Sequence, residues 1–322
     1  MQALRNSIFL AYGLSRFTKN GYDCMKKSPV EDLTALSAAG KTIVVTGANA
    51  GLGLGATEAF FLAGARVVMV VRSEEKGTAA KGELEEKHPN ASGTLEVRVA
   101  DVAQLDQVRA LAASIDECDI LVNNAGVMPT PYDELFFAHK DVELTLATNT
   151  LPTYFLTLAL EEVMRKSRDP RVIAVSSGGG LTMPLTYRQS YMTSKSSWSN
   201  RDAYSRTKRH QIALCDWFTG RRTPTTGIRY TAYHPGWSDT NAVRTAMPDF
   251  YEKVQSRLRT VEQGVDTLIW LALSEEVPIT ANFFRDRAPE YIHLPGAWTS
   301  HSVEDTDKLI DWLEELGNEW EK

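Results

Sequence analysis

The amino-acid sequence predicts an α/β fold in which a doubly wound parallel sheet of about seven strands carries helices on both faces. Three observations lead to this prediction. Short runs rich in β-branched residues alternate with helical stretches from residue 41 onward. The strand runs are almost continuously apolar, as strands covered on both faces require. No linker rich in proline, glycine or serine divides residues 41–297, so we expect a single domain there.

The expected strands recur at the spacing of strand–helix–strand units. The first run, TIVVT, is typical of a buried strand, whereas the third alternates polar and apolar residues. In chain order we expect strands at 42–46, 66–71, 95–99, 119–122, 171–176, 228–233 and 281–284.

The helices between them are predicted from charge, apolar periodicity and end signals. Pro152 falls near the start of one helix, where proline is tolerated. The segment 298–322 is expected to form a C-terminal helix that begins near Ser302 and stops at Gly317. Its apolar face consists of Leu309, Ile310, Trp312, Leu313 and Leu316. The other helices are expected at 53–62, 74–87, 104–115, 150–166, 203–218 and 261–273.

Residues 1–40 form an extension before the first strand, and residues 1–27 carry five basic side chains and one acid. At helical period Arg5, Arg16 and Asn6 share a narrow polar face, on which Phe9 also falls. The apolar stripe consists of Leu4, Ile8, Leu10, Ala11, Tyr12, Leu14 and Phe17. Three interpretations stay open: a helix packed on the body of the protein, a peripheral docking element for a membrane or a partner protein, or a cleaved mitochondrial presequence.

The composition excludes several classes of protein. With 43% hydrophobic and 24% charged residues among 322, the chain is neither disordered nor fibrous. A net charge of −6 argues against a nucleic-acid surface. Three scattered cysteines predict no disulfide framework, and no histidine or cysteine pattern predicts a metal site. We expect an intracellular, reducing compartment, cytoplasmic or mitochondrial. No apolar run reaches the ~18 residues of a membrane span, so any membrane association would be peripheral.

A glycine-rich loop joins the first strand to the first helix of the domain. It reads Thr46-Gly47-Ala48-Asn49-Ala50-Gly51-Leu52-Gly53. Glycines at such a turn let the backbone approach a pyrophosphate, and the helix N-terminus stabilises its negative charge. The sequence therefore predicts a dinucleotide-binding site in a single Rossmann-type domain.

The spacing TGxxxGxG resembles that of the short-chain dehydrogenase/reductase family, and further motifs of this family follow in order. They are Asp101-Val102, Asn123-Asn124-Ala125-Gly126, Asn149, Ser176-Ser177, Tyr204 with Lys208 as YxxxK, and Pro235-Gly236 with Thr240. The resemblance implies an oxidoreductase with Asn149, Ser177, Tyr204 and Lys208 as catalytic residues. The cofactor contacts it implies are Thr46, Gly47, Asn49, Gly51, Leu52, Gly53, Arg72, Asp101, Val102, Asn124, Ala125, Gly126, Tyr204, Lys208, Pro235, Gly236 and Thr240.

The chemistry of the Tyr–Lys pair also follows from the residues themselves. Tyr204 and Lys208 stand at i and i+4 of a helix, on one face. A neighbouring ammonium favours the phenolate, so we expect the pKa of Tyr204 to move down toward neutral pH. Tyr204 could then exchange a proton with a carbonyl or alcohol oxygen that Ser177 holds.

A second YxxxK pattern, Tyr191 with Lys195, competes with the first. Tyr191 lies 14 residues after Ser177 and Tyr204 lies 27 after it. We favour Tyr204, because the residues after Lys208 continue a helix whereas those after Lys195 indicate a loop. Residues 178–202 then become an insertion beside the site, with Tyr187, Tyr191 and Trp198 available to cover a substrate.

The end of the second strand bears on cofactor choice. An acid there would bind the ribose hydroxyls of NAD, and an arginine would accommodate the 2′-phosphate of NADP. The sequence has Val71-Arg72-Ser73, so we expect NADP(H) to be favoured over NAD(H). Glu74 or Glu75 reaching back to the ribose is the alternative.

The long interval between Ser177 and Tyr204 resembles the retinol-dehydrogenase-like branch of the family, and the resemblance extends over nearly the whole chain. It implies a substrate lid at 237–259. An apolar wall of Trp237, Met247, Phe250 and Tyr251, closed by Phe283, Phe284 and Tyr291, would suit a lipophilic retinoid, steroid or fatty aldehyde.

Two functions are carried forward. The first is an NADP(H)-dependent oxidoreductase acting on a small-molecule carbonyl or alcohol. The second is a nucleotide-binding accessory subunit of a larger assembly with little turnover, docked through residues 1–27. Neither involves nucleic acid. The family resemblance also implies a homodimer formed through the helix that bears Tyr204.

Overall fold

The computed structural model of the protein describes residues 2–130, 137–139, 142–188, 198–279, 282–294, 296 and 298–320. In this part of the chain eight strands form one sheet in the order β10-β9-β8-β7-β4-β1-β2-β3. All neighbours pair in parallel except β9 with β10. The strands are β1 (Thr42–Thr46), β2 (Arg66–Val71), β3 (Thr94–Val99), β4 (Ile120–Asn123), β7 (Arg171–Val175), β8 (Arg229–Tyr233), β9 (Phe283–Arg285) and β10 (Ala288–Pro289).

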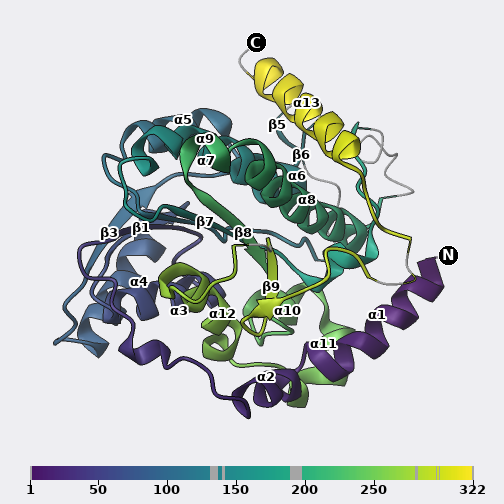
Figure 1. The fold of residues 1–322 in the computed structure, drawn as a ribbon, viewed down its shortest axis with the longest axis horizontal. Helices are drawn as coiled ribbons and strands as arrows, with labels where there is room; N and C mark the ends of the chain where they lie inside the picture. The colour runs from purple at the N-terminus through teal and green to yellow at the C-terminus, as the bar shows by residue number, and fades with distance from the viewer. Residues whose placement is uncertain are drawn as a thin grey trace.

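Helices cover both faces of this sheet, as Figure 1 shows. On one face lie α3 (Gly51–Leu62), α4 (Glu74–Lys87) and α12 (Val261–Leu273). On the other lie α5 (Leu105–Ala113), α7 (Leu151–Met164) and α8 (Asn200–Arg221). Each layer has its own apolar core, because successive strand residues point to opposite faces. The predicted doubly wound fold is confirmed; β10 adds a short antiparallel edge that the sequence did not indicate.

Shorter elements complete the fold. Two of them, β5 (Phe137–His139) and β6 (Val142–Glu143), pair separately in an antiparallel ribbon before α6 (Leu144–Asn149). The segment after β7 forms η2 (Gly178–Thr182). The remaining elements are η1 (Leu33–Ala35), α9 (Thr223–Thr226), α10 (Asn241–Ala246), α11 (Pro248–Val254) and η4 (Gln255–Arg257).

The C-terminal helix α13 (Val303–Trp320) lies across the outside of α8 (Figure 1). Its apolar side is buried against α7 and α8, and Tyr154 on α7 donates a hydrogen bond to Glu314 at 2.5 Å. The prediction that this helix stops at Gly317 is wrong. The helix runs on to Trp320, and a Cβ on Gly317 would lie 2.5 Å from the ring of Phe155. Close packing, and not a helix stop, explains this glycine.

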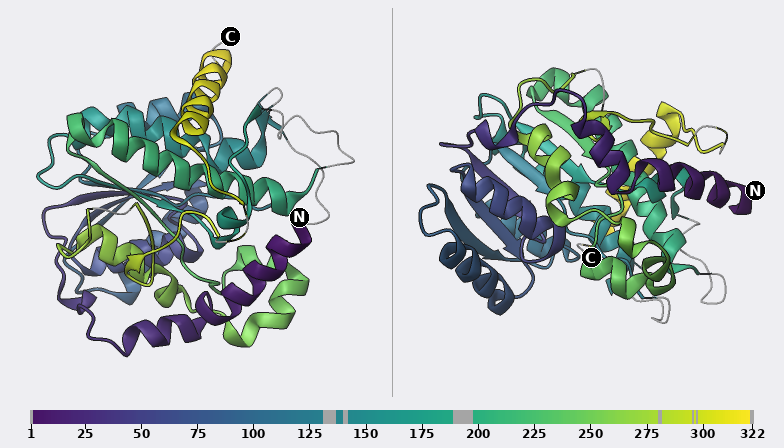
Figure 2. Two further views of the ribbon diagram at one scale, coloured as in Figure 1. Left: turned by 45° about the vertical axis from the view of Figure 1, so that its right-hand side comes forward. Right: turned by 90° about the horizontal axis from the view of Figure 1, so that it is seen from below.

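The N-terminal segment forms α1 (Gln2–Arg16) and α2 (Lys19–Lys26), and in the left view of Figure 2 the purple helix α1 runs beside the light-green helices α10 and α11. Phe17, between α1 and α2, is fully buried. The backbone oxygens of Arg16 and Thr18 accept hydrogen bonds from the buried guanidinium of Arg259, which also pairs with Asp286 at 2.6 Å. Losing one partner of such a buried ion pair costs about 3–5 kcal/mol. Of the three interpretations of residues 1–27, the contacts in this structure match the packed helix. None of the described helices is long and apolar enough to span a membrane.

We predict that His210 on α8 makes stability depend on pH. Its Nε2 lies 2.7 Å from the carbonyl oxygen of Thr186 and must carry the proton, while Nδ1 faces the hydroxyl of Thr150 at 3.2 Å. Burial lowers the pKa of His210 from 6.5 to about 4. Between these values the unfolded chain binds the extra proton, so stability falls as pH drops from 6.5 toward 4.

Chemical denaturation should therefore show a smaller loss of unfolding free energy over this window in His210→Gln than in the wild type, by up to about 1.4 kcal/mol per pH unit. The variant is expected to be less stable at pH 7.5, because it loses buried hydrogen bonds. Equal slopes in the two proteins would contradict the assignment.

Candidate active site

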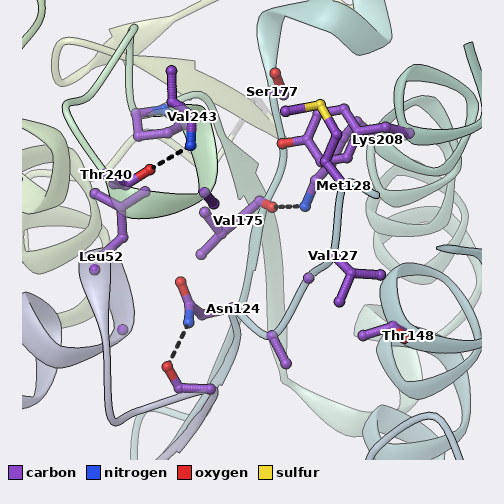
Figure 3. A pocket seen from close by; sticks show the side chains of 18 of the residues that line it. Leu52, Asn124, Val127, Met128, Thr148, Val175, Ser177, Lys208, Thr240 and Val243 are labelled. Atoms are coloured by element: carbon purple, nitrogen blue, oxygen red, sulfur yellow. Dashed lines mark hydrogen bonds between the residues drawn. The ribbon is translucent and has the colours of Figure 1, made fainter. Parts of the chain in front are cut away.

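The site lies where the chain connections diverge, at the carboxyl ends of β1 and β4. From β1 the chain continues toward β2, and from β4 toward β7, so the loops that follow these two strands separate. A cavity of about 860 Å³ opens there. In Figure 3, Ser177 and Lys208 lie on one side of it and Leu52, Thr240 and Val243 on the other.

The glycine-rich loop supplies one wall of the cavity, with Gly47, Asn49, Gly51, Leu52 and Gly53 among the lining residues. A Cβ on Gly53 would lie 2.1 Å from the carbonyl oxygen of Gly47, so the turn requires glycine there. Helix α3 begins after Ala50, whose side chain cannot cap the first N–H groups. These groups are the donors that a diphosphate needs. The loop therefore fits the pyrophosphate of a dinucleotide.

Thr46 differs from the rest of the loop, because it is buried and does not line the cavity. Its hydroxyl oxygen accepts hydrogen bonds from the backbone N–H groups of Asn124 and Ala125, at 3.0 and 2.9 Å. Asn124 in turn donates to the carbonyl oxygen of Thr46 at 2.8 Å. Thr46 thus ties the end of β1 to the segment after β4, whereas Asn124, Ala125 and Gly126 reach the cavity themselves.

The ends of β2 and β3 form one extremity of the cavity. Arg72 and Ser73 follow β2 and Asp101 and Val102 follow β3, and all four line it. Lys76, in the first turn of α4, lines it as well and was not singled out from the sequence; the available signal was a second basic residue shortly after Arg72. Neither Glu74 nor Glu75 is among the described lining residues.

The loop after β8 closes the opposite wall, and Pro235, Gly236 and Thr240 all line the cavity. The hydroxyl oxygen of Thr240 caps α10 by accepting from the N–H of Val243 at 3.4 Å (Figure 3). Because a cap of this kind fixes where a helix begins, it also positions α10 and the helix α11 that follows it.

The structure places only some of the residues of the predicted apolar wall at the cavity. Trp237, Met247 and Phe250 line the cavity, whereas Tyr251 does not and instead carries Arg244 over its ring. Phe283 and Phe284 are fully buried on opposite faces of β9, because they belong to the cores that β9 completes. Tyr291 is 59% exposed.

Among the described residues Tyr187 and Trp198 lie off the cavity, and Tyr191 and Lys195 fall outside the described part of the chain.

Ser177, Tyr204 and Lys208 meet at the inner end of the cavity. Tyr204 forms a side-chain hydrogen bond with Ser177. The ammonium nitrogen of Lys208 lies 5.4 Å from the centre of the Tyr204 ring. That nitrogen also donates to the carbonyl oxygen of Val175 at 2.7 Å and to Oε1 of Gln211 at 3.1 Å. The helical spacing of four predicted from the sequence is thus the geometry found.

The glycine triplet after β7 explains how Ser177 reaches Tyr204. A Cβ on Gly180 would lie 2.9 Å from the backbone of α8 at Lys208 and Arg209, so η2 can pack directly on that helix. The hydroxyl of Ser176 adds a hydrogen bond to the carbonyl oxygen of Lys208 at 2.8 Å. The end of β7 and the helix bearing Tyr204 are therefore held against each other.

Asn149 is buried behind the cavity and does not line it. Its amide nitrogen donates to the carbonyl oxygen of Val127 and the hydroxyl of Thr207, both at 3.0 Å, and its amide oxygen accepts from the N–H of Val127 at 2.8 Å. Its backbone oxygen accepts from Gln211 at 3.0 Å. Asn149 is therefore connected to Lys208 through Gln211, a residue that sequence reasoning missed although it lies one turn beyond Lys208.

The electrostatics of the inner end correct one expectation. In the protein without a ligand, burial raises the pKa of Tyr204 to about 12, and the hydrogen bond with Ser177 offsets only part of this effect. Burial also lowers the pKa of Lys208 to about 7, so only part of the population carries the ammonium form near neutral pH. The expectation of a lowered pKa for Tyr204 is wrong for the protein alone, because burial acts on both partners.

The fold and this cavity define a dinucleotide-dependent oxidoreductase of the short-chain type. The family described as short chain dehydrogenase matches residues 41–249, and the chain belongs to it.

Similar proteins cover most of the chain. Dehydrogenase/reductase SDR family member 12 of Bos taurus is 34% identical over 321 residues, 98% of each chain. Retinol dehydrogenase 14 of Mus musculus is 30% identical, covering 80% of this chain and 81% of its own. The predicted resemblance to the retinol-dehydrogenase-like branch is confirmed, and the similarity to member 12 extends, as expected, over nearly the whole chain.

Solved structures share the fold. The 3-ketoacyl-(acyl-carrier-protein) reductase of Brucella melitensis, complexed with NADH, matches with a TM-score of 0.58 at 23% identity over 74% of this chain and 93% of its own. The NADPH-dependent 3-quinuclidinone reductase of Rhodotorula rubra matches with a TM-score of 0.60 at 18% identity, over 80% and 96%. At these identities the likeness establishes the fold alone.

We predict that Tyr204 stays protonated across neutral pH in the ligand-free protein, because burial raises its pKa from 10.0 to about 12. The signal of Tyr204 is the tyrosinate absorbance of the wild type minus that of Tyr204→Phe. This difference should begin to rise only above pH 10. Repeating the difference titration with NADPH present measures how far the cofactor shifts this pKa. A difference signal already below pH 8 in the ligand-free protein would contradict the prediction.

Proposed function

We propose that the protein is an NADP(H)-dependent oxidoreductase that interconverts a carbonyl and an alcohol on a lipophilic small molecule. The observation that carries this proposal is the meeting of Ser177, Tyr204 and Lys208 at the inner end of a cavity whose wall is the glycine-rich loop. Bound NADPH would supply a hydride to the carbonyl carbon, and the residues of this chain would supply the proton to its oxygen.

Each residue at the inner end has a role in that proton transfer. Tyr204, protonated at neutral pH, donates its phenolic proton to the carbonyl oxygen during reduction and takes it back during oxidation. The hydroxyl of Ser177 orients the same oxygen. Lys208 uses two of its N–H groups on Val175 and Gln211, which leaves the third for the ribose hydroxyls of the cofactor. Asn149, through Gln211, keeps Lys208 in place.

The preference for NADP(H) is supported by the two cationic side chains, Arg72 and Lys76, that line the cavity beyond β2. A 2′-phosphate there would pair with the guanidinium fork of Arg72. The lipophilic substrate is supported by Trp237, Met247 and Phe250, which give the lid side of the cavity an apolar wall. The compartment and a homodimer through the helix that bears Tyr204 stay predictions. Helix α13 covers part of the surface of α7 and α8, which such a dimer would use.

We predict that Arg72→Ala weakens NADPH binding about tenfold, because a charge-assisted pair with the phosphate is lost. Binding of NADH, which has no 2′-phosphate, should change by less than about twofold. Fluorescence titration of the purified protein with each cofactor measures both constants. Lys81→Ala is the matched control, since Lys81 lies on α4, pairs with Glu85 and does not line the cavity. Equal losses for both cofactors would contradict the preference.

We predict that Tyr204→Phe lowers kcat for carbonyl reduction at least about a hundredfold, because the phenol that donates the proton is removed. The Kd for NADPH should stay within about threefold of the wild type. Stopped assays with NADPH and a panel of aldehydes and ketones measure the first effect, and titration the second. Full activity in Tyr204→Phe would contradict the role of Tyr204. Tight cofactor binding with no turnover in the wild type would favour the accessory-subunit function instead.

A further inference from the structure

Helix α1 carries side chains into the cavity from outside the domain that begins at residue 41. Phe9 and Leu10 line the cavity together with Trp237 and Phe250. We propose that α1 forms a wall at the substrate end of the cavity and that Phe9 determines how large an apolar group the site accepts. The inference rests on the proposed function, since it concerns the substrate of that same site.

The first support is a continuous row of aromatic rings. The ring of Phe9 lies 6.2 Å from that of Trp237, edge to face, and the ring of Trp237 lies 4.9 Å from that of Phe250. This row joins α1 to the lid segment and to α11. Phe9, which falls on the polar face of the helical pattern, is therefore not misplaced: it faces the cavity, which the pattern alone could not show.

The second support is the close packing of α1 on residues beside the inner end of the cavity, where Ser177 and Tyr204 lie. A Cβ on Gly13 would lie 2.3 Å from the ring of Trp237, so the helix backbone rests directly on that ring. One turn later, Phe17 packs edge to face on His234 at 4.3 Å between ring centres. Its ring also closes on Gly178, the residue after Ser177. The place of Phe9 is thus fixed relative to the catalytic serine.

The third support is the set of polar contacts that hold α1 at its C-terminal end. Arg259 donates to the carbonyl oxygens of Arg16 and Thr18, at 3.0 and 3.1 Å. The hydroxyl of Tyr12 donates to Glu290 at 2.9 Å, and Arg285 binds the same carboxylate at 2.7 Å. Helices held only by apolar contacts can slide, whereas these directional bonds set the height of α1 along the cavity.

The position of Leu10 indicates what shape of substrate the wall would serve. Leu10 lines the cavity yet is 46% exposed, so it lies at the mouth. A carbonyl compound with its oxygen at Ser177 and Tyr204 would extend its apolar part past Phe9 toward Leu10. The lining residues that α8 contributes before Tyr204, Arg201 and Asp202, are charged, whereas those that α1 contributes are apolar. We therefore assign the apolar part of the substrate to the α1 side.

The test compares Phe9→Ala with Ile8→Ala. Ile8 packs on the same apolar cluster but does not line the cavity, so both variants shorten a side chain of α1 and only one opens the wall. The measurement is kcat/KM with NADPH for a short aldehyde and for a bulky ring-bearing one. In Phe9→Ala the ratio of kcat/KM for the bulky aldehyde to kcat/KM for the short one should rise at least about tenfold above the wild-type ratio. In Ile8→Ala the same ratio should stay within about twofold of the wild-type ratio. Phe9→Leu replaces Phe9→Ala if the latter does not fold.

Each outcome decides between the two proposals. A ratio in Phe9→Ala or Phe9→Leu that moves no more than in Ile8→Ala would overturn the role of Phe9 while leaving the proposed function intact. Wild-type protein that reduces none of the carbonyls would overturn the proposed function. The wall is then judged by titration with the apolar dye 1-anilinonaphthalene-8-sulfonate, whose Kd should change at least about threefold in the Phe9 variant alone. Unchanged dye binding would overturn the wall as well.

Discussion

The buried guanidinium of Arg259 is the constraint on which the arrangement around the cavity depends. A charge taken out of water must have a counter-charge and partners for its N–H groups. Asp286 supplies the counter-charge, and the backbone oxygens of Arg16 and Thr18 supply further acceptors. The side chain also lies flat on Gly236, where a Cβ would be 2.3 Å from its Nε. One side chain thereby joins the N-terminal segment, the loop after β8 and the turn between β9 and β10.

The reactive end depends on a second kind of constraint, the exclusion of water. Burial alone raises the pKa of Tyr204 and lowers that of Lys208, so each group is pushed toward its neutral form. Within the described part of the chain, Lys208 is kept in position by Val175 and Gln211 and not by a carboxylate. The pair therefore keeps Tyr204 protonated at neutral pH in the ligand-free protein, as the proposed proton transfer requires.

Several features were predictable because their cause is local. The glycine-rich turn, the apolar strands and the i, i+4 spacing of Tyr204 and Lys208 each follow from neighbouring residues, and the fold class is confirmed. The errors have a common origin in contacts between distant segments. Gly317 was assigned to a helix end because Phe155 could not be seen beside it. Phe283 and Phe284 were expected to close the apolar wall because the sequence does not show that each ring packs into a core on one face of β9.

By itself the sequence determined the family, the sheet and the order of the motifs, since these depend on residues within a few positions of one another. Only the tertiary structure decided that an N-terminal helix lines the cavity. The hydrogen bond from Arg259 to the backbone of Thr18 spans 241 positions, and backbone acceptors carry no sequence signature. Whether Phe9 belonged to a polar face or to a cavity wall was likewise decided by what packs against it, which is Trp237, more than two hundred residues along the chain.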